Sequence, residues 1–264
     1  MLVLLFVIGA CIGSFLCCQA RRLHLRVEKH KTRGSRSVCM GCGRRLKWYD
    51  NIPIISWVML RGKCRRCHRP IGVSEILAEV GIGLAFLGIG TTFDINTTDA
   101  LLWVRFILML VFVSVMGFLA IYDGLYGELP VLYLVIGVVL AGAIMVMRQI
   151  SMSSENGFAP DIIYNPVISV GILGGLYLVL YLVSKGKCVG DGDWILGVAI
   201  GMVVFWPWLA LVELFLSNLM ACVVMLPSAI KNRKSKVYFG PFMVAAMVVV
   251  ISFAEQLSAL VGMN

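Results

Sequence analysis

The stretch that decides the fold is residues 102–121, LWVRFILMLVFVSVMGFLAI, which runs directly into Tyr122-Asp123-Gly124. An apolar run of this length, with a single arginine, is long enough for an α-helix to cross about 30 Å of hydrocarbon. The carboxylate that follows is costly at a membrane edge unless it faces protein or water, so such acids are candidates for function. The stretch therefore predicts a membrane-spanning helix that ends in a functional aspartate.

Similar apolar segments recur along the whole chain, in which 60% of the 264 residues are hydrophobic and only 14% are charged. This composition is far from that of a soluble domain. We predict an all-α polytopic membrane protein of about eight transmembrane helices, because a helix satisfies its own backbone groups in lipid. The predicted spans are residues 2–20, 76–94, 102–121, 130–147, 166–184, 194–210, 211–228 and 240–262. The sixth and seventh spans are divided only by a turn at Trp206-Pro207-Trp208.

The net charge of +9 is concentrated in three segments between spans. Residues 21–72 carry 15 of the 23 lysines and arginines, and residues 185–187 and 231–236 carry six more. Eight alternating spans put all three segments on one side, which the positive-inside rule identifies as the cytoplasm. We therefore predict that both termini lie outside. The basic loops then reflect orientation and contact with membrane lipid, and nucleic acid is not an expected partner.

One long polar segment, residues 21–75, follows the first span at residues 1–20 and contains four of the nine cysteines. We predict that it forms a small cytoplasmic domain, and that residues 76–264 form the transmembrane core.

The cysteines of this segment form two pairs, Cys39-Met40-Gly41-Cys42 and Cys64-Arg65-Arg66-Cys67. A two-residue gap lets both thiolates of a pair face one tetrahedral zinc ion, and two pairs complete a four-cysteine site. Such a closed site leaves no open position, so we assign the zinc a structural role. The alternative is four free thiols, or a redox pair, in a basic loop, since disulfides are disfavoured in a reducing cytoplasm.

A second acidic motif, Gly190-Asp191-Gly192-Asp193, opens the sixth predicted span. The predicted topology puts Asp123 and Asp193 at the same membrane face. Two carboxylates in one site share a proton, so that one acts as a base on water and the other as an acid, as in an aspartic protease. Gly190 and Gly192 allow the backbone to leave helical geometry beside a substrate. The alternative is that both acids cap helices or lie at the lipid interface.

Other acids compete with this pair or serve elsewhere. Asp191 and Glu128 lie close in sequence to the two candidates. Glu75 and Glu79 are expected to pair with loop arginines, and Glu213, inside an apolar run, is expected to be satisfied within the helix bundle.

Several motifs agree in order with one known family. They are Gly13-Ser14-Phe15-Leu16, the two cysteine pairs around Asn51-Ile52-Pro53, Asp123, the Gly190–Asp193 motif, and Phe239-Gly240-Pro241-Phe242. Together they make the chain resemble the type IV prepilin peptidases, the bacterial branch of the GxGD membrane aspartic proteases.

The resemblance implies that Asp123 and Asp193 are catalytic and that Gly190 and Gly192 support them. It implies an enzyme of the inner (cytoplasmic) membrane that cleaves the basic leader of prepilins or pseudopilins at the cytoplasmic face. The new N-terminus is then methylated with S-adenosylmethionine, and the zinc-binding loop is linked to that second activity.

Three alternatives remain at this point. Cys17, His24, Val131 and Ile195 depart from the family pattern, and no glycine-rich nucleotide-binding motif is visible. A leader peptidase without methyltransferase activity is therefore the first alternative. A proton-coupled transporter would place both aspartates near the bilayer midplane. In a zinc-loop membrane scaffold the acids would be incidental.

Overall fold

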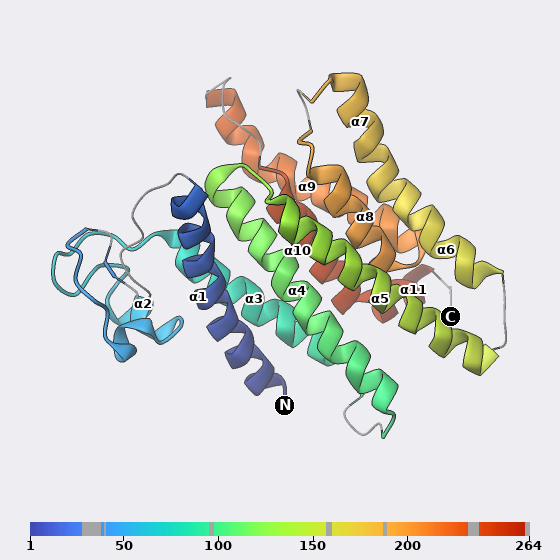
Figure 1. Cartoon of the computed structure of the whole chain (residues 1–264), viewed down its shortest axis with the longest axis horizontal. Helices are drawn as coiled ribbons and strands as arrows, with labels where there is room; N and C mark the ends of the chain where they lie inside the picture. The colour runs from blue at the N-terminus through green and yellow to red at the C-terminus, as the bar shows by residue number, and fades with distance from the viewer. Residues whose placement is uncertain are drawn as a thin grey trace. The chain divides into compact units, whose positions relative to one another are not determined.

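The computed structural model describes residues 1–27, 38–39, 41–94, 98–156, 160–186, 189–231 and 238–261. Within these ranges the chain is helical, and the pairings outside helices are two isolated β-bridges (Figure 1). The chain divides into two compact units, Met1–Gly90 and Thr91–Asn264. The predicted all-α membrane fold is confirmed, with the cysteine segment between the first and second apolar helices.

The N-terminal unit contains two long helices and a short helical segment between them. Its elements are α1 (Leu2–Val27), η1 (Trp48–Asn51), α2 (Ile55–Met59) and α3 (Val73–Thr91). Gly9 and Gly13 let α1 approach α3 closely, because a Cβ atom on Gly9 would lie 2.7 Å from the carbonyl oxygen of Ile82. Small residues four positions apart are a common device for packing helices together in membranes.

The C-terminal unit contains the remaining helices. They are α4 (Ala100–Tyr126), α5 (Val131–Asn156), α6 (Asp161–Val170), η2 (Gly171–Gly175), α7 (Leu176–Ser184), α8 (Asp193–Val204), α9 (Pro207–Lys231), α10 (Gly240–Ser252) and α11 (Ala254–Val261). The segment from α6 to α7 forms one apolar helix of 24 residues in which η2 is a π-helical turn.

Among the described residues, six helices are long and apolar enough to cross a membrane, and the pair α10–α11, bent by 70°, makes a seventh. The eighth apolar segment, α8, has only 12 residues. It ends early because Phe205 adopts a positive φ of 69°, after which α9 starts at Pro207. The break predicted around Trp206-Pro207 is thus present, but the sixth span is shorter than residues 194–210.

Helix α8 lies inside the C-terminal unit, against α5, α6, η2 and α10. Its Gly197 and Gly201 face the backbone of the neighbouring helix, so a Cβ atom on either would lie 2.9 Å or less from a backbone atom of Leu173 or Val170. This close packing fixes the position of the first residue of α8, which is Asp193.

Candidate active site

Asp123 lies in the last turn of α4 and is only 6% exposed. The helix ends at Gly127, whose left-handed backbone lets its N–H donate to the carbonyl oxygen of Asp123 at 2.7 Å. The carboxylate points away from this turn, and its Oδ2 accepts a hydrogen bond from the backbone N–H of Gly240, 3.0 Å away at the start of α10. A residue 117 positions distant in sequence therefore orients this acid.

Asp193 is the first residue of α8 and is 7% exposed. Its Oδ2 accepts a hydrogen bond from the N–H of Gly190 at 2.9 Å, so the carboxylate closes the turn that precedes the helix. A Cβ atom on Gly190 would lie 3.2 Å from that same oxygen, which is tighter than ordinary contact. Glycine at this position therefore allows the backbone to approach the acid.

The structure brings these two predicted residues together. Helix α10 packs against both α4 and α8, and the carboxylates of Asp123 and Asp193 are close enough to interact electrostatically. The turn before α8 also contacts the turn after α4, because a Cβ atom on Gly192 would lie 2.7 Å from the side chain of Leu129. Two buried acids from distant parts of the chain therefore interact electrostatically within the C-terminal unit.

The competing acids are placed differently. Asp191 and Glu128 are both exposed. Burial thus separates Asp193 from Asp191 and Asp123 from Glu128, a distinction that sequence spacing alone does not make.

Sequence reasoning missed how the site is supported. Gly240 was noted only as part of a motif, yet its N–H holds Asp123, and a Cβ atom on it would lie 2.9 Å from the Asp123 Oδ2. Next to it, Phe239 packs on the ring of Tyr177 with 5.3 Å between ring centroids. The Oη of Tyr177 accepts a hydrogen bond from the side chain of Asn218 at 3.1 Å. The sequence signal that could have identified Gly240 is its position directly before a proline at the start of a helix.

Glu213 differs from the expectation that it is satisfied inside the bundle. The residue is completely buried in α9, but neither carboxylate oxygen has a hydrogen-bond partner among the described residues. An acid buried without partners is expensive. Glu213 interacts electrostatically with Tyr177.

The four predicted zinc ligands also come together, in the N-terminal unit. The sulfur atoms of Cys39, Cys42, Cys64 and Cys67 all lie within 4.8 Å of one another. The Sγ atoms of Cys39 and Cys67 are 3.7 Å apart. Tetrahedral zinc with bonds of about 2.3 Å to sulfur requires sulfur atoms about 3.8 Å apart, so this cluster has the right size and donor chemistry for zinc.

The two cysteine pairs are built alike. The N–H of Cys39 donates to the carbonyl oxygen of Arg44 and that of Cys64 to the carbonyl oxygen of Arg69, both at 2.9 Å. Each pair therefore closes a tight hairpin, with a positive φ at Gly43 in one and at His68 in the other. The backbone N–H groups of Cys67 and Arg66 lower the pKa of the Cys64 thiol to about 6, which favours the thiolate that binds metal.

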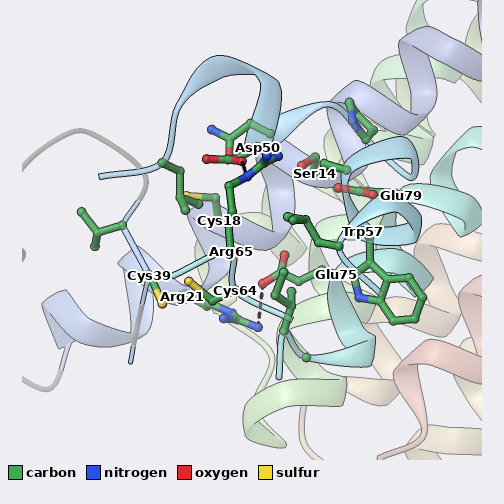
Figure 2. A pocket seen from close by; sticks show the side chains of 18 of the residues that line it. Ser14, Cys18, Arg21, Cys39, Asp50, Trp57, Cys64, Arg65, Glu75 and Glu79 are labelled. Atoms are coloured by element: carbon green, nitrogen blue, oxygen red, sulfur yellow. Dashed lines mark hydrogen bonds and ion pairs between the residues drawn. The ribbon is translucent and has the colours of Figure 1, made fainter. Parts of the chain in front are cut away.

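A cavity of about 810 Å³ lies within the same unit, lined by α1, the cysteine segment, α2 and α3 (Figure 2). Glu79 on α3 accepts a hydrogen bond from the backbone N–H of Ile54 at 2.7 Å, and Glu75 pairs with Arg21 at 2.8 Å. The expected pairing with arginine is thus present for Glu75. For Glu79 it is wrong, because the backbone of Ile54 and the hydroxyl of Ser14 take that place.

Comparison with known proteins gives a consistent result. The model of the bacterial Peptidase A24 N-terminal domain matches residues 7–93. A prepilin leader peptidase/N-methyltransferase from Myxococcus xanthus is 39% identical over 116 residues, which cover 42% of this chain and 33% of that protein. The aligned part thus spans about a third of that relative.

Longer alignments reach nearly the whole chain at lower identity. A protein of the same name from Pseudomonas putida is 24% identical over 96% of this chain and 91% of its own length. Another from Legionella pneumophila is 26% identical over 91% of this chain and 81% of its own length. No solved structure matches the chain.

Proposed function

Since the chain belongs to the prepilin leader peptidase/N-methyltransferase family, we propose that it cleaves the basic leader of type IV prepilins or pseudopilins by an aspartyl mechanism. The observation that carries this proposal is the pairing of two buried carboxyl groups, Asp123 and Asp193, at the ends of apolar helices. Buried like charges cannot both ionise cheaply, so the pair holds one proton between its members.

In the proposed reaction, the ionised carboxylate takes a proton from a water molecule whose oxygen attacks the scissile carbonyl. The protonated carboxyl gives its proton to the carbonyl oxygen, which forms the tetrahedral intermediate. The proton held on the first acid then passes to the leaving nitrogen as the C–N bond breaks, and one hydroxyl group of the intermediate returns its proton to the second carboxylate. The N–H groups of Gly240 and Gly190 each hold one oxygen of an acid and thereby orient both groups.

We propose that the same protein then methylates the exposed N-terminal amine with S-adenosylmethionine. S-adenosylmethionine would supply the methyl group, and the new N-terminal amine would be the group that receives it. Support comes from the relatives, which are prepilin leader peptidase/N-methyltransferases, and from the match of the N-terminal unit to the family model. The second candidate remains a leader peptidase without this activity.

The four-cysteine cluster is proposed to hold a structural zinc ion, because four thiols with this spacing fill a tetrahedral shell. The chain is a multi-pass membrane protein by its apolar helices. We propose that it lies in the inner membrane with its basic segments, zinc site and aspartates on the cytoplasmic side, following the positive-inside rule.

The test is cleavage of a model prepilin in proteoliposomes, read as the mass of the pilin N-terminus with S-adenosylmethionine present. We expect Asp123→Asn and Asp193→Asn to lose cleavage, while the exposed neighbours Asp191→Asn and Glu128→Gln retain it. Cleavage that survives either of the first two substitutions would exclude the aspartyl pair. A gain of one methyl mass in wild type supports the two-activity enzyme, and cleavage without that gain favours the peptidase alone.

A further inference from the structure

Two arginines of the C-terminal unit lie in membrane-spanning helices, far from the helix ends that carry the aspartates. Arg105 is on α4, 18 residues before Asp123, and Arg148 is on α5, 17 residues after Val131 at the start of that helix. At a rise of about 1.5 Å per residue, each arginine is about 25–27 Å along its helix from the aspartate end. The hydrocarbon is about 30 Å thick, so both arginines lie near the opposite face of the membrane.

The two guanidinium groups are neighbours that have no acidic partner. Helices α4 and α5 pack side by side (Figure 1), and Arg148 is close enough to Arg105 to interact with it electrostatically. Within the described part of the chain neither forms a salt bridge. Asp99, the acid closest to Arg105 along α4, caps the helix by accepting from the N–H of Leu101 at 2.9 Å. Two like charges inside spanning helices are costly without a counter-ion, so an anion from outside the protein is expected here.

Arg148 is held in place while its donors remain available. Its guanidinium carbon lies 4.6 Å from the centroid of the Phe205 ring. Phe205 is completely buried at the end of α8, and the hydroxyl of Ser169 donates to its carbonyl oxygen at 2.8 Å. A guanidinium has five N–H donors, so one aromatic contact leaves most of them available. The Arg148 side chain is only partly buried, so a ligand at the surface of the helix bundle can reach it.

Aromatic residues typical of a membrane interface lie beside this arginine. Trp206 packs edge to face on Phe205, with 5.6 Å between the ring centroids, and both Trp206 and Trp208 are partly exposed. The apolar part of α9 starts between them at Pro207 and has 19 residues, which is just enough to cross the hydrocarbon. Tryptophan is enriched where lipid headgroups begin, and arginine extends its charged end to that level. The phosphate of a membrane lipid is the anion found there.

We propose that Arg105 and Arg148 bind the phosphate group of an anionic membrane phospholipid at the face opposite the aspartates. The phosphate supplies the negative charge that the arginine pair lacks, and a guanidinium binds phosphate through two parallel hydrogen bonds. The acyl chains then lie along the apolar surface of the helices. The lipid thereby joins α4 and α5 to the end of α8, and this site is independent of leader cleavage.

The test measures lipid binding by native mass spectrometry on the full chain, purified in detergent, freed of lipid and then titrated. The probes are phosphatidylglycerol, a diacylglycerol with the same chains but no phosphate, and inorganic phosphate. We expect wild type to bind phosphatidylglycerol and neither of the other two. Equal binding of the diacylglycerol would overturn the phosphate contact. Equal binding of inorganic phosphate would overturn the lipid as its source.

Variants locate the site. Arg105→Gln and Arg148→Gln each remove one charge and keep a polar side chain, so each should weaken phosphatidylglycerol binding about tenfold. The double variant should lose less than the product of the two effects, because both groups bind one phosphate. The matched control is Lys185→Gln, which removes an exposed cation after α7 and should change binding less than about twofold.

Thermal unfolding separates a lost ligand from a damaged fold. Without lipid, Arg105→Gln should unfold at the temperature of wild type or higher, because the change removes repulsion with Arg148. With phosphatidylglycerol present, wild type should gain more stability than the variant, since it binds the lipid more tightly. If both arginine variants bind phosphatidylglycerol as tightly as wild type, or if wild type does not bind it, the site is overturned.

Discussion

The two units hold their buried carboxylates in different ways. In the C-terminal unit, Asp123 and Asp193 each accept one backbone N–H and face another acid. In the N-terminal unit, Glu79 accepts both an N–H and a hydroxyl, and its acidic neighbour Glu75 has an arginine partner. The first arrangement favours a shared proton and hence acid–base chemistry, whereas in the second two neutral donors hold the carboxyl group in one position. The neighbours of a buried acid therefore decide what it can do.

The largest expected effect separates the two sites completely. Asp193→Asn should lower prepilin cleavage by about a thousandfold, because general acid–base groups contribute about 10²–10⁴-fold. Methylation of a synthetic pilin that already has its mature N-terminus should continue, since the family resemblance links that activity to the cysteine segment, which belongs to the other unit. Mass spectrometry of both substrates checks this. Loss of both activities in a correctly folded variant would contradict the separation of the two sites and indicate one shared site.

Removing the metal site should have the opposite effect on the two activities, with methylation lost and cleavage kept. The double variant Cys39→Ser/Cys64→Ser takes one ligand from each cysteine pair, so we expect zinc content to fall from one ion per chain to none. Methylation should drop about tenfold to a hundredfold, because we propose that this activity depends on the zinc-binding segment, while cleavage changes less than about threefold.

Elemental analysis and the two activity assays measure these effects together. Cys222→Ser, an exposed cysteine on α9, is the matched control. Zinc that remains bound to the double variant would contradict the four-cysteine site.

An intermediate effect tests the support of Asp123. In Gly240→Ala the new Cβ atom would meet the Asp123 Oδ2 at 2.9 Å, which forces the acid to move. Displacing a catalytic group by a fraction of an ångström lowers cleavage by about tenfold to a hundredfold. Gly142→Ala is the control, because a Cβ atom there has no neighbour within 4 Å. Equal activity of the two variants would show that the Gly240 contact does not orient the acid.

Sequence was sufficient for features that depend on local spacing. The apolar runs predicted the helices, and the repeated two-residue gap predicted that Cys39, Cys42, Cys64 and Cys67 gather. Alternation of spans was enough to predict that Asp123 and Asp193 lie at the same membrane face, but not how far apart they lie.

Features that depend on contacts between distant residues could not be predicted from the sequence. The short length of α8 follows from the positive φ of Phe205, which no local rule assigns to phenylalanine. The hydrogen bond from the N–H of Gly240 to Asp123 joins residues 117 positions apart. The bond from Ile54 to Glu79 requires a backbone conformation that isoleucine rarely adopts, so a salt bridge with a loop arginine was the reasonable expectation.

A smaller effect is expected at Glu213, the buried acid that has neither kind of support. Replacing a buried group without partners by an apolar one of similar size removes its desolvation penalty. Glu213→Leu should therefore stabilise the protein by about 1–3 kcal/mol, and its apparent melting temperature in detergent should rise by several degrees. Glu213→Gln keeps a polar group and should give a smaller increase. A loss of cleavage in Glu213→Leu at unchanged stability would instead assign this acid to the active site.

The smallest effect concerns the backbone that holds Glu79. Ile54 has a φ of 62° and a ψ of −54°, a conformation that costs a β-branched residue about 1–2 kcal/mol. Ile54→Gly relieves this strain but adds about 0.5–1 kcal/mol of backbone entropy to the unfolded chain. The net change should be a stabilisation of up to about 1 kcal/mol, and the N–H that binds Glu79 is kept.

The neighbouring Ile55→Gly, at the start of α2, is the matched control, because it carries the same entropy term without any strain to relieve. Thermal unfolding of the two variants should therefore shift in opposite directions. If both lower the melting temperature equally, the strain at Ile54 is not stored in the folded state.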